Sequence, residues 1–124
     1  MRGLKTLRVY DASQAFAAAV GRFLRSSSVP VKDAEQLRRS AKSIGDNIAE
    51  GHGYGVGKNR IRVYRLARGS AQESLNQLRG LLDDELLPRK EFYALFNLGR
   101  TIVKMLGEQI GAAELWAMQN AVVS

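Results

Sequence analysis

Cysteine is absent from this chain, and histidine occurs only once, at position 52. Without cysteine there is no disulfide framework, no thiolate metal site and no cysteine nucleophile. A carboxylate-bridged dimetal site in a helical bundle uses paired Glu-x-x-His motifs. Here Glu50 and His52 are two positions apart, which does not place them on one helix face, and no second such pair exists. We therefore predict no metal site and no cofactor.

Long apolar runs are missing as well. No stretch approaches the ~20 residues that a membrane span needs. The first residues, MRGLKTLRVY, are basic but lead into no apolar region of the kind found in secretory signals. The sequence thus predicts a cytoplasmic protein without membrane contact, and its 124 residues are suited to a single domain, 1–124.

Acidic residues are too few to balance the basic ones. The chain has 19 Lys and Arg against 12 Asp and Glu, a formal net charge of +7. The excess is concentrated in residues 1–30 and 57–84. Such a surplus favours contact with polyanions through the accumulated potential, whatever the fold.

Alternating strand patterns are also absent, and apolar residues recur instead with a helical period. Proline and glycine separate the periodic segments: Pro30 follows the first, a glycine-rich elbow at 51–57 follows the second, and Pro88 opens the last. The predicted helices are 8–27, 32–51, 58–84 and 88–110. Because the connections are short, we predict an all-α, antiparallel up-down-up-down four-helix bundle.

The last segment, 111–124, leaves two alternatives open. It either extends the fourth helix or folds back as a short docking segment. Its apolar residues Leu115, Trp116 and Met118 need cover, which either a subunit interface or packing on the bundle end would supply.

Cations gather on two of the predicted helices. Arg38, Arg39 and Lys42 lie on the solvent side of the second helix. On a helical wheel of the third, Lys58, Arg62 and Arg65 share one stripe with Arg68 on its flank. Such stripes suit phosphate contacts with RNA or DNA, which are salt-dependent and largely independent of sequence. The alternative is a solvated face whose cations pair with Asp and Glu.

No catalytic arrangement emerges. The elbow HGYGVGKN has His52 where a phosphate-binding Walker loop needs glycine, and Asn59 where it needs Ser or Thr. A plain interhelical turn is favoured over an anion site there. Ser70 and Ser74 lie in a helix without a recognisable base. We predict that the protein is not an enzyme.

Six further residues form a predicted structural motif between the second and third helices. The polar members are expected to hydrogen-bond across the two helices and fix their register. Gly69, with Ser70 and Ala71, is expected to allow close helix approach. The set is Asn47, Glu50, Gly51, Gly69, Ser70 and Glu73.

Two segments carry a family resemblance: residues 36–51, QLRRSAKSIGDNIAEG, and residues 62–78, RVYRLARGSAQESLNQL. They resemble the signature of the bacterial four helix bundle protein family, also named for 23S rRNA intervening sequences. The similarity runs from about Leu7 to Gly107. One departure is Gly45, where many members have proline.

The resemblance implies a short four-helix bundle. It also relates the chain to the accessory variability proteins of diversity-generating retroelements, which are basic homopentamers that bind nucleic acid and a reverse transcriptase. By resemblance alone we expect a homo-oligomer, most simply a homopentamer. The predicted function is therefore non-catalytic nucleic-acid binding.

The alternative is an oligomeric scaffold or adaptor for protein partners. It is favoured by the scarcity of aromatic residues available for base stacking, since Tyr64 falls on the apolar face and leaves only Tyr54 free.

Overall fold

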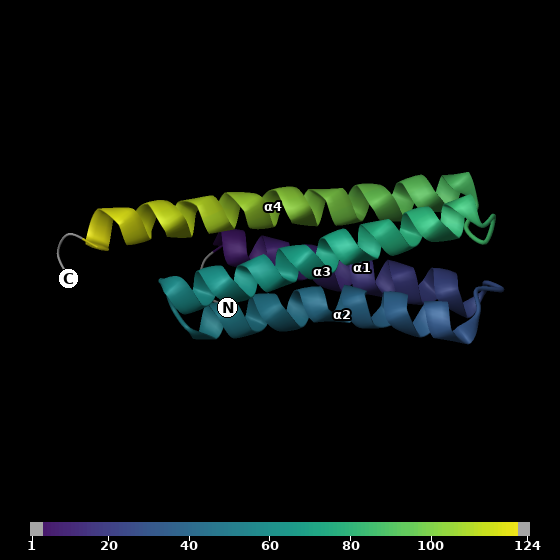
Figure 1. Cartoon of the computed structure of the whole chain (residues 1–124), viewed down its shortest axis with the longest axis horizontal. Coiled ribbons are helices and arrows are strands. Elements are labelled where there is room, and N and C mark those ends of the chain that lie inside the picture. The colour runs from purple at the N-terminus through teal and green to yellow at the C-terminus, as the bar shows by residue number, and fades with distance from the viewer. Residues whose placement is uncertain (1–3, 122–124) are drawn as a thin grey trace.

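The computed structural model describes residues 4–121, and the side chains of residues 7–121. Its elements are α1 (Leu4–Arg25), α2 (Val31–Gly53), α3 (Lys58–Asp83) and α4 (Arg89–Ala121). Figure 1 shows the four helices lying lengthwise beside one another. Helices α1 and α3 each pack against α2 and α4, which closes the bundle. The predicted antiparallel four-helix bundle is confirmed, and no strand occurs between residues 4 and 121.

The core is built from one apolar stripe of each helix. Phe16, Ile44, Leu78 and Ile102 represent the four stripes, and each is completely buried. Burial of a side chain of this size contributes about 1.5–3 kcal/mol. Within the described range, none of the helices combines the length and apolar character needed to cross a bilayer.

The elbow between α2 and α3 is an interhelical turn held by Arg60. The Arg60 guanidinium donates from Nε to the carbonyl of Gly51 and from Nη2 to the carbonyl of His52, both at 3.2 Å. The bond to Gly51 satisfies a carbonyl in the last turn of α2, and the carbonyl of His52 also accepts from the amide of Gly55 at 3.2 Å. Gly55 and Gly57 have φ angles of 74° and 135°, values that glycine adopts readily, and they reverse the chain.

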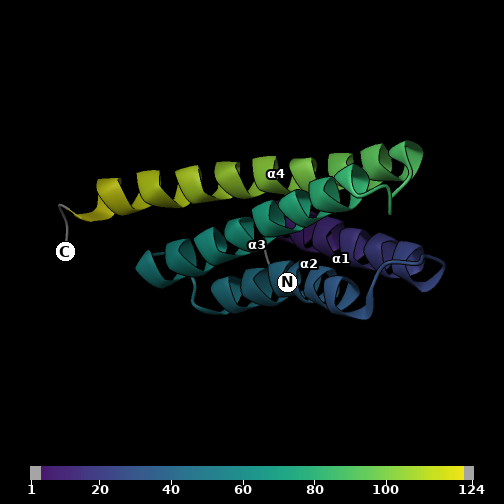
Figure 2. The same cartoon turned by 45° about the vertical axis from the view of Figure 1, so that its right-hand side comes forward.

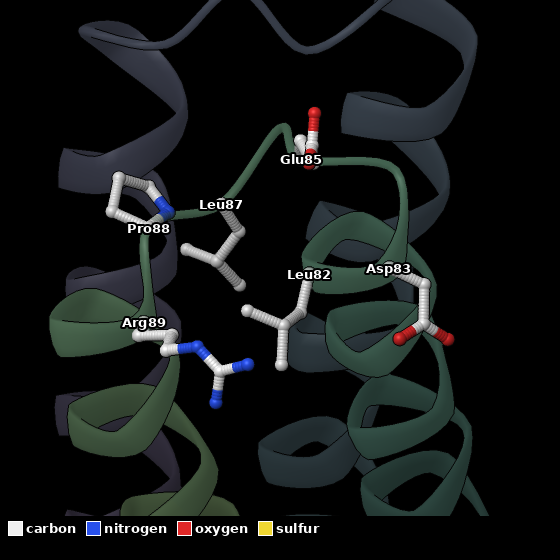
Figure 3. A pocket seen from close by; sticks show the side chains of 6 residues that line it. All are labelled: Leu82, Asp83, Glu85, Leu87, Pro88 and Arg89. Carbon is white, nitrogen blue, oxygen red and sulfur yellow. The ribbon is translucent and has the colours of Figure 1, made fainter.

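The corner between α3 and α4 is closed by an apolar contact. In Figure 3 the side chains of Leu82 and Leu87 point toward one another, while Glu85 points away from them. Glu85 has a φ of 60°. The amide of Leu86 donates to the carbonyl of Leu81 at 2.9 Å and that of Glu85 to Leu82 at 3.0 Å. This is the hydrogen-bond pattern of a Schellman cap, with glutamate at the position that usually holds glycine.

The helix ends differ from the predicted ones in two places that matter. The first helix begins at Leu4, before the predicted residue 8, and ends at Arg25, where the Ser27 hydroxyl donates to the carbonyl of Leu24 at 3.0 Å. The fourth helix continues to Ala121, so the fold-back alternative is wrong for residues 111–121. Residues 122–124 lie outside the described range. In both Figure 1 and Figure 2, the end of α4 extends beyond the other three helices.

Candidate functional site

The predicted cations lie on two separate surfaces. Arg39 lines a groove between α2 and α3 together with Ser70 and Glu73. Arg62 precedes Glu73 by about three helical turns, or roughly 16 Å along α3. Arg39 therefore lies at a different level of the bundle from Lys58 and Arg62. Arg68 is two residues from Ser70, which lines the groove of Arg39.

Two of the predicted cations are paired with carboxylates. The Lys42 ammonium lies 2.9 Å from Asp46, one turn along α2. The hydrogen bond to Asp46, and then its charge, raise the pKa of Lys42 above its ordinary value. Arg65 reaches from α3 to Glu114 of α4 at 3.2 Å. Both pairs are substantially exposed, so each adds little stability.

The other predicted cations are not paired with a carboxylate of the described residues. Among the described residues, Arg38, Arg39, Lys58, Arg62 and Arg68 form no ion pair. Arg68 is half-buried, and the other four are exposed. Within the described residues, the predicted alternative of cations with carboxylate partners is met at Lys42 and Arg65. Carboxylate partners in a neighbouring subunit, which that alternative includes, stay a prediction.

A chain of hydroxyl groups joins α2 to α3. The Oγ atoms of Ser40 and Ser74 lie 2.7 Å apart, and those of Ser43 and Ser70 lie 2.9 Å apart. The Ser40 hydroxyl also lies 2.7 Å from Oε1 of Gln77, to which it can donate. We call this set, with Asn47, the serine seam.

Most of the serine seam was missed by the sequence prediction. The residues not foreseen as cross-helix partners are Ser40, Ser43, Ser74 and Gln77. A signal for them exists: small polar residues recur at helical spacing beside each apolar stripe, at positions 40, 43 and 47 and again at 70, 74 and 77.

The predicted polar motif is correct in part. Ser70 bonds across the helices, and Asn47 supports that contact by donating to Ser43 Oγ at 3.0 Å. Glu50 instead accepts from the Tyr54 hydroxyl at 3.2 Å, and Glu73 accepts from Gln77 at 3.3 Å within its own helix. Both carboxylates are exposed, so their predicted role in bonding across α2 and α3 is wrong.

The two motif glycines have different surroundings. Gly51 is buried against the ring of Tyr64, and an added Cβ would lie 2.6 Å from two ring carbons. Gly69 is exposed, and an added Cβ there would meet no atom within 4 Å. Close approach of α2 and α3 therefore depends on Gly51, and the predicted packing role of Gly69 is wrong because it faces solvent.

Neither serine of α3 is placed for nucleophilic catalysis. Ser74 is completely buried, and its hydroxyl is engaged by Ser40 and by the carbonyl of Ser70. Within residues 4–121, no three His, Asp or Glu side chains gather as a metal ion would require.

A second groove, the α3–α4 groove, lies between the first turns of α3 and the last turns of α4, with a volume of about 710 Å³. The groove was not predictable from the sequence, because its two walls are distant in the chain. Lys58, Arg62 and Arg65 line it from α3, and Ala117 and Met118 line it from α4. Three of the four predicted α3 cations thus form the rim of an apolar groove, and Arg68 is not among its lining residues.

The comparisons with known proteins agree with the fold. The sequence model of the 23S rRNA-intervening sequence protein family matches residues 5–108. A crystal structure of a protein of unknown function from the S23 ribosomal protein family of Bacteroides thetaiotaomicron superposes with a TM-score of 0.81 and 27% identity. The alignment covers 87% of this chain and 99% of that one. No curated protein matches. This chain belongs to the 23S rRNA-intervening sequence protein family.

Proposed function

We propose that this is a non-catalytic cytoplasmic protein that assembles into a homo-oligomer and binds nucleic acid through phosphate contacts. The observation that carries the proposal is a set of exposed cations that have no carboxylate partner among the described residues, Arg38, Arg39, Lys58 and Arg62. Each phosphate that such a cation neutralises releases condensed counterions, which favours binding. The net charge of +7 adds attraction over a longer range.

Self-association is supported by the end of α4. Leu115 and Trp116 are 55% and 45% exposed there, although both are large and apolar. Contact with another subunit would remove this surface from water. The pentameric state is proposed by family resemblance alone.

A scaffold or adaptor for protein partners is the second candidate. Tyr64 is completely buried and unavailable for stacking on bases. The α3–α4 groove, in contrast, offers an aliphatic surface of the kind that binds protein segments.

The test is fluorescence anisotropy with labelled single-stranded RNA, single-stranded DNA and duplex DNA at about 50 and 200 mM salt. The first variant reverses Arg38 and Arg39 to Glu, and the second reverses Lys58 and Arg62. A matched control reverses Arg100 and Lys104, which are exposed on α4 and lie outside the predicted set.

We expect salt-sensitive binding that falls at least about tenfold in one or both of the first two variants, with a salt slope smaller by about two. The control should retain most of the affinity. Absence of binding at both salt concentrations would overturn the proposal. An equal loss in the control would show a nonspecific response to net charge and would overturn the assignment of the surface.

A further inference from the structure

The α3–α4 groove opens where the two helices diverge. Figures 1 and 2 both show α3 and α4 close together at their shared corner and farther apart where α3 begins and α4 ends. The groove runs along the helices and has a volume of about 710 Å³. Its long shape follows from its walls, which are two nearly antiparallel helices.

The lining of the groove is aliphatic. Ile61 lies buried at its base, and Ala117 is half-buried beside it. Leu66 and Met118 stand on opposite walls and are 51% and 72% exposed. Large exposed apolar side chains that line one open groove mark a surface that gains stability when a partner covers it.

The rim of the groove is positively charged. Lys58 and Arg62 lie along the α3 side, and neither forms an ion pair with a described residue. Among the described lining residues Glu114 alone is acidic, and Arg65 already pairs with it at 3.2 Å. A partner that places carboxylates beside Lys58 and Arg62 would therefore meet uncompensated positive charge.

The shape and charge of the groove distinguish between three possible ligands: nucleic acid, a second copy of the chain and a helix of a partner protein. None of the described residues that line the groove is aromatic, so these residues offer no platform on which unpaired bases stack. A second copy of the chain would bring another net charge of +7 against a basic rim. An amphipathic helix fits a linear aliphatic groove, because side chains at i, i+3, i+4 and i+7 form a matching apolar stripe.

We propose that the α3–α4 groove binds an acidic amphipathic helix of a partner protein. The apolar stripe of that helix packs on Ile61, Leu66 and Met118, and its flanking carboxylates pair with Lys58 and Arg62. The α4 wall, including Met118, lies beyond residue 108, where the family match ends. The proposal shares Lys58 and Arg62 with the proposed nucleic-acid surface, and a peptide assay without nucleic acid tests it separately.

The probe is a labelled synthetic peptide of about 18 residues, roughly five helical turns, with leucine at the stripe positions and glutamate elsewhere. One control peptide has the same composition in scrambled order, which removes the stripe. A second replaces every glutamate with lysine. Anisotropy of each peptide is measured against the full chain at about 150 mM salt, where weak long-range attraction is screened.

The decisive variant is Leu66→Gln with Met118→Gln, which makes both walls polar without changing the charge. The matched control is Leu98→Gln, a leucine 40% exposed on α4 that does not line the groove. We expect the acidic peptide to bind, and the double variant to weaken it at least about tenfold, the effect of losing one well-buried apolar side chain. Leu98→Gln should change the affinity less than about twofold.

Three results would overturn the proposal. If the scrambled peptide binds as tightly as the acidic amphipathic peptide, binding depends on the charge of the peptide and not on an apolar stripe that packs in the groove. If the lysine peptide binds as tightly as the glutamate peptide, Lys58 and Arg62 do not bind the partner through its carboxylates. Sedimentation showing that the double variant, but not Leu98→Gln, dissociates an oligomer would assign the groove to a second copy of the chain.

Discussion

The hydroxyl oxygens of Ser40 and Ser74 lie 2.7 Å apart inside the contact between α2 and α3. Only 4% of Ser40 and none of Ser74 is exposed, so water cannot replace either partner. One arrangement of hydrogens satisfies the group: Ser74 donates to Ser40, Ser40 donates to Gln77, and Gln77 donates to Glu73. The chain of bonds ends at an exposed carboxylate, where solvent completes it. The serine seam thereby fixes the axial register of two helices whose apolar faces alone tolerate sliding.

The stability effects of substitutions at Ser40 and Ser74 in the serine seam should not be additive. We expect Ser40→Ala and Ser74→Ala each to lower the free energy of unfolding by about 1 kcal/mol. The double variant should cost less than the sum, because each single change already breaks the shared bond. Urea denaturation measures all three. Ser26→Ala, an exposed change at the end of α1, serves as an additive control with Ser40→Ala, and additivity within the Ser40–Ser74 pair would contradict the role of the seam.

The two motif glycines should respond in opposite directions to the same substitution. Gly51→Ala forces a methyl group against the Tyr64 ring and should destabilise the protein by about 1–3 kcal/mol. Gly69→Ala adds a methyl group in open space in the middle of α3, where alanine is favoured over glycine by about 1 kcal/mol. Thermal unfolding followed by circular dichroism compares them. A stabilising Gly51→Ala change would refute the close contact.

The Tyr64 hydroxyl is a buried polar group without a hydrogen-bond partner among the described residues. Tyr64→Phe removes that hydroxyl while keeping the ring that covers Gly51 and that lies 5.9 Å from the Arg60 guanidinium. Because an unsatisfied buried hydroxyl costs about 1–3 kcal/mol, Tyr64→Phe should preserve or increase the free energy of unfolding. Denaturant titration measures the change, and a clear loss of stability would mean that the hydroxyl has a partner.

Glu85 occupies the left-handed region, with a φ of 60°, at the cap of α3. Glycine adopts this conformation without the steric cost that a side chain incurs, so Glu85→Gly should raise stability by about 1 kcal/mol. Asp84→Gly is the matched control: the neighbouring residue is also exposed but has a φ of −83°, and glycine should not help there. Equal melting-temperature shifts for the two variants would contradict the assigned cap.

The helical bundle was predictable because its determinants are local. Apolar residues spaced at 3–4 positions, with Pro30, Pro88 and the glycine elbow between them, specify four amphipathic helices without reference to any distant contact. The motif at 36–51 and 62–78 likewise indicated the family, which the match over residues 5–108 confirms. The end of α4 was less determined, because a glycine at position 111 weakens a helix without ending it.

The candidate sites were predictable only in part, because they depend on which flank of each helix meets a neighbour. Helical wheels placed the cations outward, and those of α2 and the start of α3 are exposed. The wheels did not show that these cations are separated along the bundle, or that Glu50 and Glu73 face solvent while Ser43 and Ser70 face each other.

By itself, then, the sequence determined the four helices, their antiparallel order, the family and the positive charge, since periodicity, loop length and composition are properties of the chain alone. Only the tertiary structure decided that Ser40 bonds Ser74, that Gly51 and not Gly69 lies against a ring, and that Leu66 and Met118 line one groove between α3 and α4. Each of these joins residues distant in the chain. Their distances follow from the rotation and register of packed helices, which local sequence patterns do not encode.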